Sequence, residues 1–242
     1  TWDGARWTLD ADGAPTRLAK DVVKTIFDDA IKTNNRLLIE FGTKTAKLAR
    51  INAMITLAAD KVPVSVDDLD ANEWLLNCPN GTLDLRTGLL SDHERWQHIT
   101  KLCPTEYRDK ATCPRWETFL HEVFADDDLI GFVQRLLGYC LTGDVSEQKL
   151  PIFWGTGANG KSTLLNAVMD TVGADYTMQA MPDFLMERRH ESHPTEKASL
   201  FGKRFVACVE TEASRKLAES TVKTLTGGEK IMARRMREDF WE

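Results

Sequence analysis

Apolar positions along the 242-residue chain change their spacing several times, and each spacing predicts a kind of element. Between residues 20 and 60 they recur every three to four positions, which predicts helix. The same spacing after Pro114 predicts an amphipathic helix, because proline suits a first helical position. Residues 129–141 are apolar nearly all round and should form a buried helix that ends at Gly143.

Turn residues separate shorter segments that read as strands. Asp10–Gly13 predicts the turn of a small strand pair within residues 2–12. Pro79–Gly81 and Thr87–Gly88 flank a predicted hairpin strand that begins at Thr82. The apolar runs 150–154 and 204–209 are typical of short buried strands. We therefore expect a mainly α-helical domain over residues 1–143 and an α/β domain over 144–242.

A glycine-rich loop follows the first of these apolar runs and precedes a predicted helix over 164–169. Residues 155–163 fit the phosphate-loop pattern G-x-x-x-x-G-K-[ST]. A chance match is the alternative, and the flanking strand and helix patterns make it rarer. We expect all nine residues to bind nucleotide: Gly155, Thr156, Gly157, Ala158, Asn159, Gly160, Lys161, Ser162 and Thr163.

Each residue type in this loop has a physical role. The glycines permit backbone angles that turn successive N–H groups toward one anion, and the following helix adds its positive end. Lys161 is placed to reach the β- and γ-phosphates of ATP, and the hydroxyl of Ser162 is placed to ligate Mg²⁺. ATP and Mg²⁺ are therefore the expected cofactors.

The second predicted buried strand ends in two carboxylates, Glu210 and Glu212. A carboxylate at the C-terminal end of a strand beside the phosphate-loop strand can hold Mg²⁺, and an adjacent one can polarise the attacking water. We predict Glu210 as a metal ligand and both glutamates as catalytic together with Lys161. The alternative is that these acids only cap the next helix.

Residues 213–237 carry a net charge of +5 within a chain of formal net charge −6. A local basic segment in an acidic chain indicates a polyanion contact, although a solvated surface is the usual alternative. Gly227 and Gly228 separate a predicted helix over 217–226 from a short predicted hairpin. The expected DNA-binding residues are Lys223, Lys230, Arg234 and Arg235.

Several classes are disfavoured by the sequence. No apolar run approaches the length of a membrane span, and no secretory leader is visible, so we expect a cytoplasmic protein. Five scattered cysteines without a C-x-x-C pair indicate free thiols in a reducing compartment. His190 and His193 lack neighbouring ligands of zinc-site spacing and are read as part of a surface loop.

The motifs together resemble those of phage, plasmid and poxvirus primase-helicases. Those before the phosphate loop resemble their helical domain: residues 80–88, 105–107, 113–116, 119–120 and 136–143. Those from the phosphate loop onward resemble their superfamily III helicase core: residues 157–163, 200–204, Glu210 and 223–234. Glu229 occupies a position that is usually Asp in that family, which is a mild departure.

This resemblance implies an ATP-driven DNA helicase of replication forks, with an AAA+-like phosphate-loop parallel sheet flanked by helices. It also implies a homo-oligomeric ring, a hexamer in the expected case, around single-stranded or forked DNA, and a basic hairpin that grips one strand. The family carries a primase domain upstream. Its sensor asparagine and arginine finger lie downstream of the position of Trp241.

Both ends of the sequence read as cuts in a longer polypeptide, so we expect this fragment alone to bind ATP–Mg²⁺ but to hydrolyse it weakly. Two other functions stay open. A small-molecule kinase would explain the phosphate loop but not the basic segment. A nucleotide-binding or oligomerisation module without its own turnover would also retain the loop.

Overall fold

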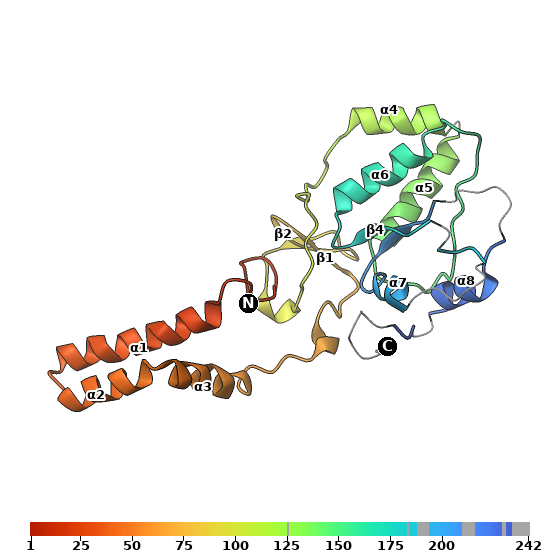
Figure 1. Cartoon of the computed structure of the whole chain (residues 1–242). Helices are drawn as coiled ribbons and strands as arrows, with labels where there is room; N and C mark the ends of the chain where they lie inside the picture. Colours follow the sequence, from red (N-terminus) through yellow and green to blue (C-terminus); the bar gives the residue numbers. More distant parts are fainter. Residues whose placement is uncertain (125, 183, 188–193, 210–215, 229–230, 234–242) are drawn as a thin grey trace.

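The computed structural model describes the chain except residues 125, 183, 188–193, 210–215, 229–230 and 234–242. Figure 1 shows a helical arm on one side and a larger body of helices and short strands on the other. In chain order, the helices and strands are α1 Ala14–Lys32, α2 Arg36–Thr45, α3 Leu48–Ala59, β1 Leu75–Cys78, β2 Gly81–Asp84, β3 Leu90–Ser91, α4 Pro114–Val123, α5 Asp127–Cys140, α6 Lys161–Val172, β4 Thr177–Gln179, α7 Pro194–Ala198, β5 Phe205–Ala207 and α8 Glu219–Thr226. Two short 3₁₀ turns, η1 Val66–Asp68 and η2 Arg95–Gln97, complete the described elements.

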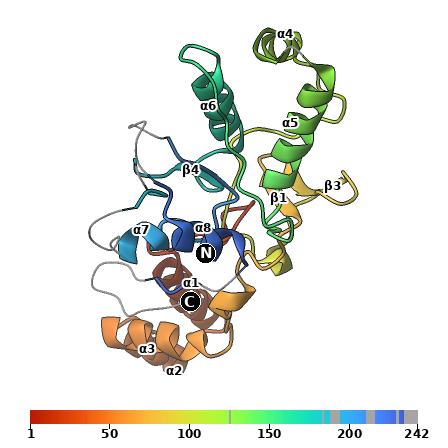
Figure 2. The same ribbon diagram turned by 90° about the vertical axis from the view of Figure 1, so that its right-hand side faces the viewer.

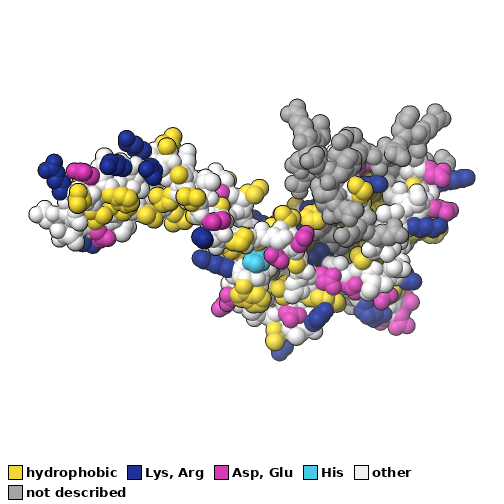
Figure 3. Space-filling model, turned by 90° about the horizontal axis from the view of Figure 1, so that it is seen from below, with side chains coloured by type: hydrophobic (Ala, Val, Ile, Leu, Met, Phe, Trp, Pro, Cys, Tyr) yellow, Lys and Arg dark blue, Asp and Glu magenta, His cyan; other side chains and the backbone are white. Residues whose placement is uncertain are grey.

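The arm consists of α1, α2 and α3, which divide the helical run predicted between residues 20 and 60. The first division lies at Asn34, which has a φ of 48°, and Asn35, whose side chain accepts hydrogen bonds from the backbone N–H groups of Leu37 and Leu38. The arm buries mainly small side chains, such as Ala19 and Ala30. Figure 3 shows hydrophobic side chains spread along its surface.

The strand pair predicted over residues 2–12 is reduced to one antiparallel bridge between Trp2 and Trp7. Their connection turns at Asp3, whose carboxylate accepts hydrogen bonds from the N–H groups of Ala5 and Arg6. The predicted turn at 10–13 instead leads into α1, with Gly13 in the left-handed region at φ 74°. Turn-favouring residues indicate a change of direction, and here a helix follows.

The predicted hairpin that begins at Thr82 is confirmed as β2 and β3, and β1 pairs with β2 in the same antiparallel sheet, with Leu76 opposite Leu83. Gly81 begins β2 with a φ of 146°, and a Cβ atom there would lie 2.4 Å from the carbonyl oxygen of Ser91. Only glycine fits this close approach. The sheet forms the part of the body nearest the arm (Figure 1).

Helices α4, α5 and α6 lie at the far end of the body from the arm (Figure 1), and Figure 2 shows them from the side. The predictions of a helix beginning at Pro114, a helix over 129–141 and a helix over 164–169 are confirmed, although α5 leaves Leu129 and Phe132 exposed.

The parallel sheet is smaller among the described residues than predicted. β4 and β5 pair in parallel, with Met178 opposite Val206. The run 150–154 forms no described strand, and Ile152 and Trp154 are 71% and 91% exposed. A strand needs a partner for its N–H and C=O groups as well as apolar side chains, and the described residues supply none here. The AAA+-like sheet therefore stays a prediction beyond this strand pair.

Two hydrophobic clusters form the core of the body, and each combines residues from before and after position 144. The first contains Leu76, Cys78, Leu83, Cys103, Val172 and Tyr176. The second contains Leu120, Ile130, Val133 and Leu164, with Phe153 packed against them. The predicted boundary between the two domains stays a prediction, and the packing across it is continuous.

No helix within the described ranges is long and apolar enough to cross a bilayer.

Candidate functional site

The candidate site is the loop that enters α6. The loop ends at Gly160, which has φ 82° and ψ −3° and lies directly before the first helical residue, Lys161. Ala158 also has a positive φ, 58°. Two left-handed residues so close together turn the backbone sharply into the helix, and this brings the loop to the positive end of α6.

The side chain of Lys161 folds back over the loop. Its Nζ donates hydrogen bonds to the carbonyl oxygens of Gly155 and Thr156, at 3.1 and 3.4 Å, and to Oδ1 of Asn159, at 2.7 Å. The ammonium group thus lies inside the curve of the loop. An anion that entered this curve would meet the positive charge directly, which suits a phosphate group.

Asn159 and Gly155 are in close contact across the loop. A Cβ atom on Gly155 would lie 2.2 Å from Nδ2 of Asn159, so the amide occupies the space beside the glycine. The next residues, Ser162 and Thr163, are exposed in the first turn of α6. The hydroxyl of Ser162 is therefore accessible to a hydrated cation, and the donor chemistry of the loop fits ATP with Mg²⁺.

The predicted carboxylates Glu210 and Glu212 lie outside the described residues. The strand predicted before them is confirmed over Phe205–Ala207 as β5. Among the described residues, no group of three or more His, Cys, Asp or Glu side chains could hold a metal ion.

The basic segment is described only in part. Lys223 lies exposed on α8, which matches the helix predicted over 217–226 with a start two residues later. Lys230, Arg234 and Arg235, together with most of the predicted hairpin, lie outside the described residues.

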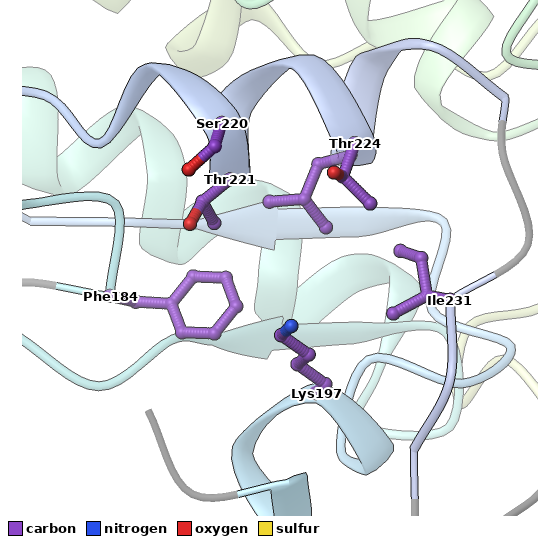
Figure 4. Close-up of a pocket in the computed structure, with 7 residues that line it drawn as sticks. Phe184, Lys197, Ser220, Thr221, Thr224 and Ile231 are labelled. Carbon is purple, nitrogen blue, oxygen red and sulfur yellow. The ribbon is translucent and has the colours of Figure 1, made fainter. Parts of the chain in front are cut away.

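A small cavity between α7 and α8 was not foreseen from the sequence. It measures about 210 Å³, and Figure 4 shows Phe184, Lys197 and Thr221 around the same space. Ser220 and Thr221 come from the first turn of α8, whereas Lys197 comes from α7. A second cavity of about 450 Å³ lies beside it, is lined by Met178 and Met181, and shares Phe184.

A half-buried arginine, Arg204, joins the start of β5 to the antiparallel sheet and to the end of α5. Arg204 donates hydrogen bonds from its two terminal nitrogens to the carbonyl oxygens of Leu75 and Leu141, each at 2.8 Å. Burial lowers the pKa of its guanidinium from the usual value. The sequence motif at 200–204 contained this residue, but its polar character gave no sign that it would be half-buried.

Tyr176 and Asn77 extend this contact inward. Tyr176 is 1% exposed, and burial raises the pKa of its hydroxyl to about 12. The hydroxyl oxygen accepts a hydrogen bond from the backbone N–H of Asn77 at 3.2 Å. The amide of Asn77 in turn donates to the carbonyl oxygens of Ala5 and Lys101. Asn77 is thus hydrogen-bonded to three separate segments of the chain, and these bonds favour one relative position of the segments.

A second polar contact joins the segment before β1 to residues 100 and 101. Asp70 forms an ion pair with Lys101 at 2.8 Å and accepts hydrogen bonds from the backbone N–H and the hydroxyl of Thr100. Burial by itself would raise the pKa of Asp70, but the hydrogen bonds from Lys101 and Thr100 outweigh it and lower the pKa.

The five cysteines are free, as predicted. Cys78 and Cys103 lie buried together in the first hydrophobic cluster, and Cys103 Sγ also donates to the carbonyl oxygen of Thr171 at 3.2 Å. Thr171 belongs to the last turn of α6, so this thiol contacts the helix that begins at the candidate loop.

The sequence was compared with families and with other proteins. The model of the family described as D5 N terminal like matches residues 1–125, and that of a family of unknown function, DUF5906, matches residues 153–242. A protein of Acanthamoeba polyphaga mimivirus named "Putative helicase L207/L206" is 29% identical over 231 residues. That alignment covers 92% of this chain, which spans 23% of the relative's length. The D5 N terminal like model covers more than half of the residues of this chain, so the chain belongs to the D5 N-terminal-like family.

Proposed function

We propose that this chain is the nucleotide-binding part of an ATP-dependent DNA helicase of the primase-helicase type. The observation that carries the proposal is the position of Lys161, whose ammonium lies within a loop that ends in left-handed Gly160 at the start of α6. A lysine that follows a glycine-rich loop at the start of a helix supports binding of a nucleoside triphosphate. The mimivirus relative, whose name states helicase, supports the type of activity.

In this proposal, the loop N–H groups and Lys161 bind and orient the phosphates of ATP. The hydroxyl of Ser162 and the carboxylate of Glu210 hold Mg²⁺, and Glu212 orients water. Bound Mg²⁺ supplies charge neutralisation for phosphoryl transfer. Lys223, Lys230, Arg234 and Arg235 contact DNA phosphates within a homo-oligomeric ring, which we take to be a hexamer.

Binding of a fluorescent ATP analogue in the presence of Mg²⁺ tests the nucleotide site. Lys161→Ala should weaken binding by at least about tenfold, because it removes the only side-chain charge that we assign to the phosphates. Lys149→Ala is the matched control, since Lys149 is exposed and precedes the loop. Equal affinities for Lys161→Ala and the control would refute the assignment.

A second measurement separates the helicase from the two alternative functions. Single-stranded DNA binding that weakens steeply with salt favours the helicase over a small-molecule kinase. Turnover of ATP by the full-length protein, stimulated by DNA, favours it over a module without its own turnover. The exposed Lys223 belongs to the basic segment 213–237. Neither a small-molecule kinase nor a module without turnover requires such a segment, so it favours the helicase.

A further inference from the structure

The phosphate loop rests against a helix from the other family-matched segment. A Cβ atom placed on Gly160 would lie 2.5 Å from Cγ2 of Val123 and 3.3 Å from Cε2 of Phe119. Both side chains belong to α4. The backbone of Gly160 is therefore in direct contact with α4, and a side chain larger than hydrogen cannot enter between them.

Val123 and Phe119 of α4 form a wall against Gly160, and the side chains behind this wall are well packed. Leu120 of α4 is 1% exposed and Leu164 of α6 is 0% exposed, and both lie in one cluster with Val133 of α5. The rings of Trp116 and Phe119 lie 5.5 Å apart and cover the same cluster. A close-packed wall of this kind resists displacement, so it restricts the movement of the backbone that touches it.

We infer that Val123 and Phe119 are positioning residues for the triphosphate of a nucleotide bound in the loop. This inference rests on the proposed function. Gly160 keeps its left-handed conformation at φ 82° between α6 and this wall, and that conformation aims the loop N–H groups at the phosphates. A loop held in its binding geometry before the ligand arrives loses less entropy on binding, and affinity is correspondingly higher.

The wall and the loop come from different family-matched segments. Helix α4 lies within residues 1–125, which match the D5 N terminal like model, whereas the loop lies within residues 153–242. The first segment therefore contributes to the nucleotide site through packing, although neither of its wall residues carries a group that binds phosphate.

The test compares two valine truncations, one at the contact with Gly160 and one in the cluster behind it, each in the whole chain. Val123→Ala removes the methyl group that touches Gly160. Val133→Ala is the control, because Val133 is 3% exposed in the cluster behind α4 but is not among the residues nearest to Gly160. Val133→Ala should lower the melting temperature at least as much as Val123→Ala, because Val123 is only half-buried. Only Val123→Ala should weaken binding of the Mg²⁺–ATP analogue, by about tenfold, at a temperature where both are folded.

A reciprocal pair of variants tests the contact itself. Gly160→Ala should abolish nucleotide binding, because its methyl group would overlap Val123. Combining Gly160→Ala with Val123→Ala should recover part of the binding. Equal affinities for Val123→Ala and Val133→Ala, or a double variant that binds no better than Gly160→Ala, would overturn the inference.

Amide hydrogen exchange of the nucleotide-free protein tests the positioning of the loop by α4 without relying on nucleotide binding. Val123→Ala should speed exchange of the Leu164 amide, which donates to the carbonyl oxygen of Gly160 at 2.9 Å, more than Val133→Ala does. If the wild-type chain fails to bind nucleotide but this difference is present, the proposed function fails and the positioning of the loop by α4 stands. If exchange is the same in both variants, the positioning role is wrong whatever the chain binds.

Discussion

The guanidinium carbon of Arg204 lies over the ring of Tyr176, 4.8 Å from the ring centre. The backbone N–H of Arg204 also donates to the carbonyl oxygen of Tyr176 at 2.7 Å, so the two residues are joined by both side chain and backbone. This pair fixes the start of β5 next to β4, and the hydrogen bonds of Arg204 to Leu75 and Leu141 tie both strands to β1 and to the end of α5.

Replacing Arg204 by methionine should destabilise the fold. Two carbonyl oxygens would lose their donors, which is expected to lower the free energy of unfolding by about 2–4 kcal/mol. Urea unfolding followed by circular dichroism measures the loss. Arg108→Met is the control, because the side chain of Arg108 is 75% exposed and a surface pair contributes little. If Arg204→Met had the stability of the wild type, the hydrogen bonds to Leu75 and Leu141 would not contribute to the free energy of unfolding.

Replacing Asp70 by asparagine should destabilise the fold in a pH-dependent way. Asparagine tolerates the φ of 54° at this position but leaves Lys101 without its counter-charge, so a loss of about 2–4 kcal/mol is expected at pH 7.

The pH dependence follows from the lowered pKa of Asp70. A carboxylate whose folded-state pKa is below the ordinary 3.8 contributes stability that is present above 3.8 and is lost as the pH falls through the folded value. The difference between wild type and Asp70→Asn should therefore stay constant from pH 7 down to about 5 and shrink below 3.8. Unfolding curves across this range measure it, and a difference that grows on acidification contradicts the prediction.

Gly173→Ala should disrupt the end of α6. Gly173 has a φ of 85°, and an added Cβ would lie 2.3 Å from Cδ of Pro104, a ring that cannot rotate away. We expect a loss of about 2–4 kcal/mol, from the strained backbone together with the overlap. Gly88→Ala is a matched control, since Gly88 has a φ of 71° with no atom within 4 Å of the new methyl group. It should lose only about 1 kcal/mol. If both variants had comparable melting temperatures, the overlap of the new methyl group at position 173 with Pro104 would not destabilise the protein.

Lys223→Ala should weaken binding of single-stranded DNA under the proposed function. One lost phosphate contact lowers the salt dependence, so the slope of log affinity against log salt should fall by about 0.7. Fluorescence anisotropy with labelled oligonucleotides at several salt concentrations measures this slope. Lys24→Ala, on the exposed surface of α1, should leave it unchanged. If both variants keep the wild-type slope, Lys223 does not contact DNA.

Helix positions were predictable because several local signals agreed. Pro114 begins α4, and Gly173 follows the last residue of α6, as their backbone chemistry requires. The helix predicted over 164–169 is confirmed, and it begins three residues earlier, at Lys161, because the preceding glycine permits the left-handed turn. The hairpin expected from Thr82 formed as β2 and β3, since turn signals bound it, whereas β1 was not predicted as a strand.

Features that depend on distant partners were not predictable. The apolar run ending at Trp154 suggested a buried strand, but a run of apolar residues does not specify which strand would pair with it. β4 was missed, because its three residues contain no apolar run and pair only through β5. The partial burial of Arg204 could not be foreseen either, since it depends on carbonyl groups at positions 75 and 141 that become neighbours only in the folded chain.

The two ends of α6 lie in different hydrophobic clusters, with Leu164 in one and Val172 in the other, and each cluster holds residues from before position 144. The helix cannot unwind without exposing both clusters. The amide hydrogens of α6 and β1 should therefore be among the slowest to exchange with solvent, with similar free energies of opening. The segments that match two separate families would then open and close as one cooperative unit.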